Sequence, residues 1–130
     1  MTSAVVLDAS ALLALIREEP GGEAVAGAIA RACMSAVNFA EVVSYLTYAG
    51  VPIDQIENML TPLPVIVVDA DVELAWMAGR LRKKTAAAGL SLGDRFCLAL
   101  AARDGLPAWT ADRQWLSVAE RLEVEVFIIR

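Results

Sequence analysis

Residues 5–16, VVLDASALLALI, join a short β-branched run to an apolar helical pattern through one acid, Asp8. Residues 4–7 predict a buried strand, and residues 10–17 predict the helix that follows it. Short strands and longer helical segments alternate in the same way along the rest of the chain. Such alternation is typical of βα units, in which the strands run parallel and helices cover the sheet. We therefore predict an α/β protein with three layers, a central parallel β-sheet flanked by helices.

The remaining elements follow from hydrophobic periodicity and turn residues. Residues 64–68, PVIVV, predict a buried strand, and residues 71–88 predict one long amphipathic helix. No linker or repeat divides the chain, so residues 1–130 are predicted to form a single domain. The other predicted strands lie at 33–34, 107–110 and 124–129, and the other predicted helices at 22–32, 37–49, 53–60 and 91–103. The predicted buried stripe of the helix at 37–49 is formed by Phe39, Val42, Val43 and Leu46.

The composition restricts the chemistry available to the chain. It contains no histidine, which excludes Ser–His–Asp and Cys–His sites and any nuclease that relies on a histidine acid–base pair. Its net charge of −5 argues against a simple basic surface for nucleic acid, although a carboxylate cluster that holds cations would itself add negative charge. Hydrophobic residues make up 58% of the chain, more than a soluble monomer needs, so we expect part of the surface to be buried against another chain.

Several sequence features predict a cytoplasmic protein that does not enter a membrane. No apolar run reaches the ~18 residues of a membrane-spanning helix. Residues 1–16 are apolar, but Asp8 interrupts them and no basic residue precedes them, unlike the pattern of a secretory signal. Cys33 and Cys97 lack CxxC spacing and lie in apolar surroundings, as reduced core cysteines do.

Four acids stand at positions where α/β proteins bind ligands. Asp8 and Asp112 each directly follow a predicted strand, and ligands of open parallel sheets bind beyond the carboxyl ends of the strands. Asp94 lies in the first turn of a predicted helix, and Glu41 lies in the first half of another. Each acid alone also has a structural interpretation, as a helix cap or, for Glu41, as an ordinary surface acid.

Taken together, four segments of the sequence resemble the PIN-domain family. The family pattern is a strand ending in Asp-x-Ser, a glutamate in an N-x-x-E-like helix, an aspartate that opens a helix, and T-x-D after a strand. The matching segments are Asp8-Ala9-Ser10, Asn38-Phe39-Ala40-Glu41, Asp94 within LSLGDRFCLALA (90–101), and Thr110-Ala111-Asp112. Order, spacing and chain length fit over nearly the whole sequence, so the resemblance implies a PIN-like fold.

The resemblance implies an endoribonuclease that needs Mg²⁺ or Mn²⁺ and hydrolyses RNA phosphodiester bonds with a metal-activated water. Stand-alone PIN domains of this size resemble VapC-type toxins of type II toxin–antitoxin systems, which form dimers and are held inactive by a co-expressed antitoxin. The physics agrees, because carboxylates ~4 Å apart repel by about 1 to 4 kcal/mol per pair and a cation with hard oxygen ligands relieves that repulsion. The resemblance thus implies three partners: RNA, a cognate antitoxin and a second copy of the chain.

The resemblance also implies roles for individual residues. Asp8 and Asp94 are expected to be the chief metal ligands, and Asp112 is expected to complete the cation site or to hold its waters. Glu41 is expected to orient the attacking water or to bind the cation through water. The residues expected to fix these acids by hydrogen bonds are Ser10 and Thr110.

Three alternatives to an active PIN-type nuclease make different demands on the same residues. A phosphoacceptor, receiver-like signalling domain would have an adjacent acidic pair near the first strand and a lysine before the last helix, whereas this chain has the single Asp8 and no lysine after Lys84. An aspartate-nucleophile phosphatase of the haloacid dehalogenase kind would have Asp-x-Asp after the strand, where Ser10 stands instead. A PIN-like module that binds with weak or no catalysis is left open, and so is the identity of the RNA.

Overall fold

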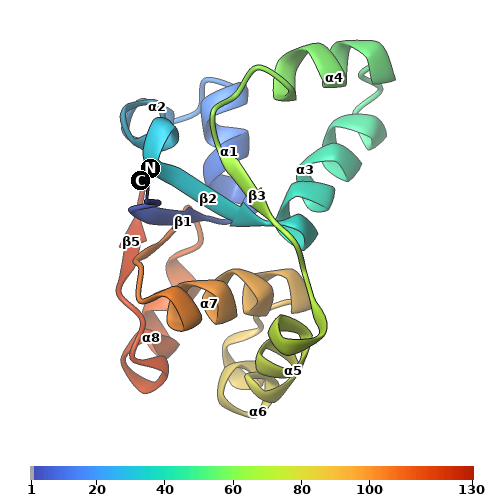
Figure 1. The fold of residues 1–130 in the computed structure, drawn as a ribbon. Coiled ribbons are helices and arrows are strands. Elements are labelled where there is room, and N and C mark those ends of the chain that lie inside the picture. The colour runs from blue at the N-terminus through green and yellow to red at the C-terminus, as the bar shows by residue number, and fades with distance from the viewer. Residues whose placement is uncertain (1) are drawn as a thin grey trace.

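The computed structural model describes residues 2–130 as a five-stranded sheet between two layers of helices (Figure 1). All neighbouring strands pair in parallel, in the order β3-β2-β1-β4-β5. The strands are β1 (Val5–Leu7), β2 (Ala32–Ser35), β3 (Ile66–Val68), β4 (Ala108–Thr110) and β5 (Val126–Ile128). Because the strands are parallel, their carboxyl ends meet along one edge of the sheet. The predicted three-layer α/β fold is therefore confirmed.

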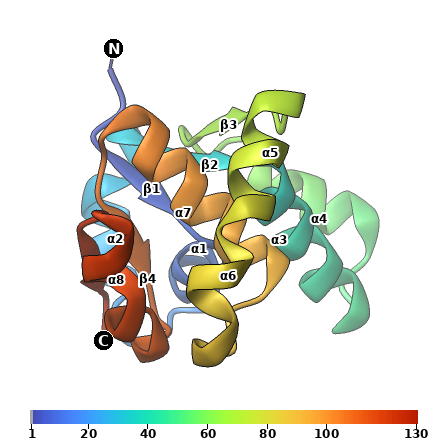
Figure 2. The ribbon, with the colours of Figure 1, turned by 90° about the horizontal axis from the view of Figure 1, so that it is seen from below.

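Each face of the sheet has its own set of helices. In Figure 1, α1 to α4 lie above the sheet and α5 to α8 lie below it, and Figure 2 shows α7 running across the central strands. The helices are α1 (Ala9–Ile16), α2 (Gly22–Ala28), α3 (Ala36–Tyr48), α4 (Ile53–Leu60), α5 (Val72–Arg80), α6 (Arg82–Thr85), α7 (Leu92–Asp104) and α8 (Leu116–Leu122), with short 3-10 turns η1 (Ile29–Arg31), η2 (Ala86–Ala88) and η3 (Arg113–Trp115). Among the helices formed by residues 2–130, none has both the length and the apolar character needed to cross a membrane.

The sheet separates two hydrophobic cores. Val6 of β1 belongs to the core beneath α7, together with the fully buried Leu98 and Trp115. Its neighbour Leu7 belongs to the core on the other face, where it joins Leu12 of α1. Successive residues of a strand face opposite sides of a sheet, so a strand of three residues serves both cores. Each fully buried side chain of this size contributes about 1.5–3 kcal/mol.

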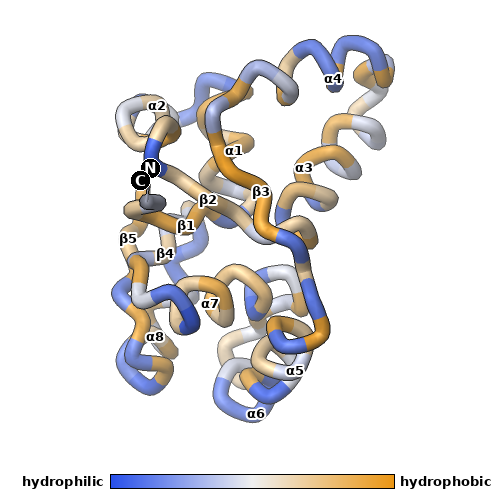
Figure 3. Tube along the Cα trace, in the orientation of Figure 1, coloured by the Kyte–Doolittle hydropathy of each residue, from blue (hydrophilic) through white to orange (hydrophobic). Residues whose placement is uncertain are grey.

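The strand at 64–68 was predicted to be buried, and this prediction is wrong. β3 pairs only with β2 and forms an open edge of the sheet. Ile66 is 51% exposed and Val67 is 39% exposed, and Figure 3 shows the apolar strand lying at the outside of the molecule. A continuous apolar run fits a strand buried on both faces, but it carries no information about whether a neighbour covers the second edge.

The single helix predicted over 71–88 is also wrong. The segment divides into α5, α6 and η2, and it ends at Gly89 with a positive φ of 72°. Thr85 Oγ1 donates a 2.8 Å hydrogen bond to the carbonyl of Leu81, a local bond that competes with regular helix geometry. The break lets α5 pack along α7 while α6 reaches α8. The other predicted elements agree with the structure to within a few residues.

Candidate active site

Asp8 lies at the carboxyl end of β1, where its side chain caps α1. Its Oδ1 accepts hydrogen bonds from Ala11 N at 3.0 Å and from Ser10 Oγ at 2.7 Å, and its Oδ2 accepts one from Thr110 Oγ1 at 2.8 Å. The residue is only 4% exposed. The capping interpretation of Asp8 is therefore correct, and the same carboxylate is also tied to β4 on the neighbouring strand.

Burial raises the pKa of Asp8 from 3.8 to about 7. The hydrogen bonds from Ser10, Ala11 and Thr110 lower the pKa because they favour the ionised form, but they do not offset the loss of solvent. The negative charge of Asp94 raises the pKa further. Near neutral pH this carboxyl is therefore divided between its two protonation states, and a nearby cation would favour the ionised one.

Ser10 and Thr110 connect the ends of β1 and β4. Ser10 Oγ accepts a 2.9 Å hydrogen bond from Ala111 N, and Thr110 Oγ1 accepts a 3.0 Å bond from Asp112 N. Both hydroxyls thus donate to Asp8 and accept from the backbone beyond β4. Asp112 Oδ1 in turn accepts from Gln114 N at 2.9 Å and caps η3.

Asp94 occupies the first turn of α7 and forms a capping box with Ser91. Its Oδ2 accepts a 2.9 Å hydrogen bond from Ser91 N, and its own N–H donates to Ser91 Oγ at 3.1 Å. Burial raises the pKa of Asp94, and the charge of Asp112 raises it further. The structure therefore brings Asp94 within electrostatic reach of Asp112 as well as of Asp8.

Glu41 reaches the same acids from α3. Burial raises the pKa of Glu41, the hydrogen bond from Asn38 lowers it, and the charge of Asp94 raises it. Glu41 Oε1 accepts a 2.9 Å bond from Asn38 Nδ2. The carboxyl lies against Gly93, where a Cβ atom would fall 2.5 Å from Glu41 Cδ. Asp94 is thus the residue through which all four acids influence one another.

Asn38 and Gly93 belong to the site, although the sequence alone predicts a role for neither. Asn38 is completely buried, whereas the apolar Phe39 and Val43 of the predicted stripe are only half-buried. Two signals were available in the sequence: the spacing of three residues between Asn38 and Glu41 on one helix, and a glycine directly before Asp94. Neither signal is interpretable until α3 and α7 are known to meet.

The donor set suits a hard divalent cation. The four carboxylates come from separate segments, and carboxylate oxygens are the ligands that Mg²⁺ and Mn²⁺ prefer. Burial raises the pKa of the Cys97 thiol, and the charges of Asp8 and Asp94 raise it further, so this thiol stays neutral. Within residues 2–130, no three acidic or cysteine side chains are gathered tightly enough to form a ready-made metal cage. Mg²⁺ commonly retains several waters and binds one or two carboxylates, so it does not require such a cage.

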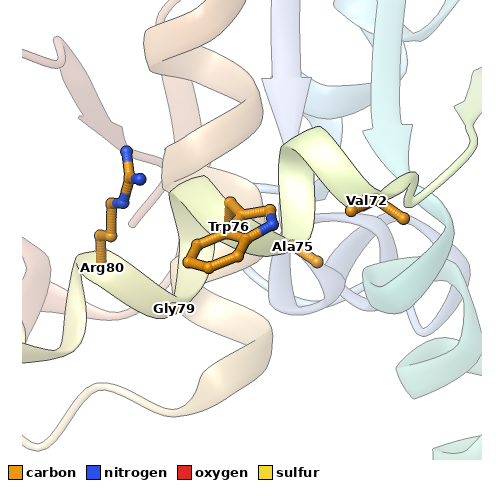
Figure 4. Close-up of a pocket in the computed structure, with 5 residues that line it drawn as sticks. All are labelled: Val72, Ala75, Trp76, Gly79 and Arg80. Carbon is orange, nitrogen blue, oxygen red and sulfur yellow. The ribbon is translucent and has the colours of Figure 1, made fainter.

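Two surface hollows are relevant to ligand binding, one beside Glu41 and one along α5. Glu41 lines an open groove of about 620 Å³ together with Val37, Ala40, Ser44, Tyr45 and Tyr48, all on α3. A second hollow of about 440 Å³ lies along α5 and is lined by Val72, Ala75, Trp76, Gly79 and Arg80, with the guanidinium of Arg80 over the ring of Trp76 (Figure 4). No carboxylate lines this second hollow, whereas the first includes Glu41, so the acidic cluster and the groove beside Glu41 are the candidate active site.

Comparison with known proteins identifies the family model and the solved structures that this chain resembles. The sequence model of the PIN domain matches residues 5–121. The fold is similar to chains in the DNA-bound VapBC crystal structure from Salmonella typhimurium (TM-score 0.75, 17% identity, covering 99% of this chain and 100% of that one) and in VapBC-5 from Mycobacterium tuberculosis (TM-score 0.67, 24% identity, 97% and 98%). A chain of a toxin–antitoxin complex from Klebsiella pneumoniae also matches (TM-score 0.74, 16% identity, 98% of each chain). A search among curated proteins finds no significant match.

Proposed function

Because the chain belongs to the PIN-domain family, we propose that it is an endoribonuclease dependent on Mg²⁺ or Mn²⁺ and that it acts as the toxin of a toxin–antitoxin pair. The main support is the electrostatic coupling of four acids: Asp94 raises the pKa of both Asp8 and Glu41, and Asp112 raises that of Asp94. Mutually repelling carboxylates in a partly buried site favour a bound cation.

We propose a role for each residue of the acidic cluster and for the hydroxyl groups that bind Asp8. Asp8 and Asp94 would hold the cation, and Asp112 would complete its site or hold its waters. Ser10 and Thr110 keep the Asp8 carboxylate fixed by their hydrogen bonds. A bound divalent cation would lower the pKa of a water molecule and stabilise charge on the leaving oxygen.

Glu41 is proposed to orient the attacking water. Its Oε1 accepts from Asn38, which leaves Oε2 to accept a hydrogen bond from water. Burial raises the pKa of Glu41, and a raised pKa makes a carboxylate a better proton acceptor near neutral pH. No histidine is needed for this chemistry.

The toxin role is supported by the solved structures of similar fold and by exposed apolar side chains. The similar chains come from VapBC and other toxin–antitoxin complexes. Exposed on the surface are Tyr48 of α3 and both Val72 and Trp76 of α5, of which Val72 is 73% and Trp76 is 63% exposed. We propose that such surfaces are buried in a homodimer and by a cognate antitoxin. An antitoxin arginine that pairs with the carboxylates would inhibit the enzyme, because a guanidinium bridges carboxylates through paired hydrogen bonds.

Cleavage of RNA by the purified chain tests the proposal. We expect cleavage with Mg²⁺ or Mn²⁺, no cleavage with excess chelator, and 5′-phosphate ends, because water and not the ribose 2′-hydroxyl attacks. Products with 2′,3′-cyclic phosphates would contradict the mechanism. Induced expression of the chain, with and without the product of an adjacent antitoxin gene, tests the toxin role. Unchanged growth in both cultures would overturn the toxin role but not the proposed nuclease activity.

A further inference from the structure

Asn38 makes a set of hydrogen bonds that the helix itself does not require. Both donors of its amide are used: Nδ2 donates to Glu41 Oε1 at 2.9 Å and to the carbonyl of Gly93 at 2.9 Å. Its Oδ1 accepts a 2.6 Å bond from Ser35 Oγ. The side chain is fully buried, so these partners fix the amide in one orientation without help from bulk water.

Asn38 is the third residue of α3, the position whose side chain completes a capping box with the N-cap residue. Ser35 caps α3 and accepts a 3.2 Å bond from Asn38 N, as an N-cap residue does. In a capping box the third residue of the helix would return its side chain to the N-cap backbone. Asn38 instead directs its amide toward Glu41 and Gly93. Its side chain therefore links α3 to α7 by hydrogen bonds.

Gly93 completes this contact from the side of α7. A Cβ atom there would lie 2.5 Å from Glu41 Cδ, so the Glu41 carboxyl occupies the space that any other residue would fill. The carbonyl of Gly93 accepts the second bond of Asn38, and the next residue is Asp94. One buried amide thus joins Glu41 to the backbone that carries Asp94.

We propose that Asn38 is a positioning residue that fixes Glu41 relative to Asp94 by bridging Glu41 to the Gly93 backbone. The proposal rests on the proposed nuclease function, because it assigns Asn38 an effect on the reaction through Glu41. Residues that orient catalytic ligands in this way typically change activity by about 10–100-fold when they are replaced.

A double-mutant cycle tests the role. Asn38→Leu keeps the branching of the side chain at Cγ and removes the amide. We expect kcat to fall by about 10–100-fold, with KM for RNA changed much less. In a Glu41→Gln background, the same Asn38→Leu change is expected to have little further effect, because no carboxylate remains to be positioned. An equal loss in both backgrounds would overturn the proposal and indicate a general structural role.

A measurement without RNA tests the contact itself. In the metal-free protein, NMR should detect a slowly exchanging Asn38 side-chain amide whose chemical shift changes in Glu41→Gln, since a charged acceptor becomes neutral. A rapidly exchanging amide whose chemical shift is the same in the parent and in Glu41→Gln would overturn the proposal. Asn58→Leu makes the same substitution at an exposed asparagine of α4, and as a control it should leave the Asn38 amide signal unchanged.

The outcomes separate the two proposals. A wild-type protein that cleaves no RNA would overturn the proposed function together with the role of Asn38. A wild-type protein that cleaves RNA, with kcat insensitive to Asn38→Leu in a folded variant, would overturn the role of Asn38 alone. If Asn38→Leu fails to fold, Asn38→Ala replaces it, because it removes both donors without adding a charge beside Glu41.

Discussion

The hydroxyl of Thr110 donates a 2.8 Å hydrogen bond to Oδ2 of Asp8, although the two residues are 102 positions apart in the chain. The contact depends on the parallel pairing of β1 with β4, in which Leu7 lies opposite Trp109. The residues that follow these two strands therefore meet at the carboxyl edge of the sheet. The bond favours the ionised form of Asp8 and so opposes, in part, the effect of burial on its pKa.

Thr110→Val should lower activity while the protein stays folded. Valine keeps the shape of threonine but removes the donor to Asp8, so the pKa of Asp8 should rise further and metal affinity should fall. We expect a loss of about 10–100-fold in activity at fixed metal concentration. Metal titration of RNA cleavage measures the effect. Thr85→Val, at an equally buried threonine of α6 outside the acidic cluster, should leave cleavage unchanged.

The stability of the metal-free protein should depend on pH through Asp8. Its pKa is about 7 in the folded protein and 3.8 without the fold, so the folded state favours the proton. The resulting stabilisation is fully present below about pH 4 and is lost as pH rises through about 7. The shift corresponds to at most roughly 4 kcal/mol. Asp8→Asn should therefore be more stable than the parent at pH 8 but not at pH 4.

Urea unfolding with chelator at both pH values measures this difference. If the free energies of unfolding of the two proteins run parallel from pH 4 to pH 8, the Asp8 carboxyl does not titrate in this range. The same variant should cleave no RNA, because it lacks a ligand charge.

Gly93→Ala should separate activity from stability. The new methyl group would meet the Glu41 carboxyl, which lies at the end of a flexible side chain and can move aside. The fold should survive, and alanine favours the helix by up to about 1 kcal/mol. Activity should fall because Glu41 leaves its position. Gly27→Ala on α2, where a Cβ atom meets nothing, is the matched control. Full activity in Gly93→Ala would show that the position of Glu41 is unimportant.

Trp76→Glu should weaken self-association. Trp76 is 63% exposed and lies beside Val72 on α5, so a charge there should oppose burial of this face in a homodimer. Light scattering after size exclusion should find a dimer for the parent and a larger monomer fraction for the variant. Leu116→Glu, at a 54% exposed leucine of α8, controls for the added charge. A parent protein that is monomeric at all concentrations would contradict the dimer proposal.

The sequence predicts local structure better than the relationships between elements. The rhythm of strands and helices predicted the parallel sheet correctly, because each βα unit carries its own hydrophobic pattern. The exposure of β3 could not be predicted, because an edge is defined by the absence of a neighbour. The break after α5 could not be predicted either, since its cause includes the packing of α6 on α8.

The candidate site shows the same limit. The four acids were found from their motifs, and the structure brings Asp8, Glu41 and Asp112 each within electrostatic reach of Asp94. Their assignment as metal ligands remains a prediction. Asn38 was not assigned a role, because a buried asparagine on a helix has no meaning until its partner on α7 is known. The contribution of Gly93 depends on that same contact.

The order of the strands also determines when the active site can form during synthesis. β1 is made first, but one of its two neighbours in the sheet, β4, consists of residues 108–110. Until that segment pairs with β1, Asp8 lacks its bond from Thr110, and Asp112 is not held at the carboxyl edge of the sheet. If the chain is the nuclease that we propose, its acids come together only after β4 has been made and has paired with β1, so a nascent chain should gain activity only late in its synthesis.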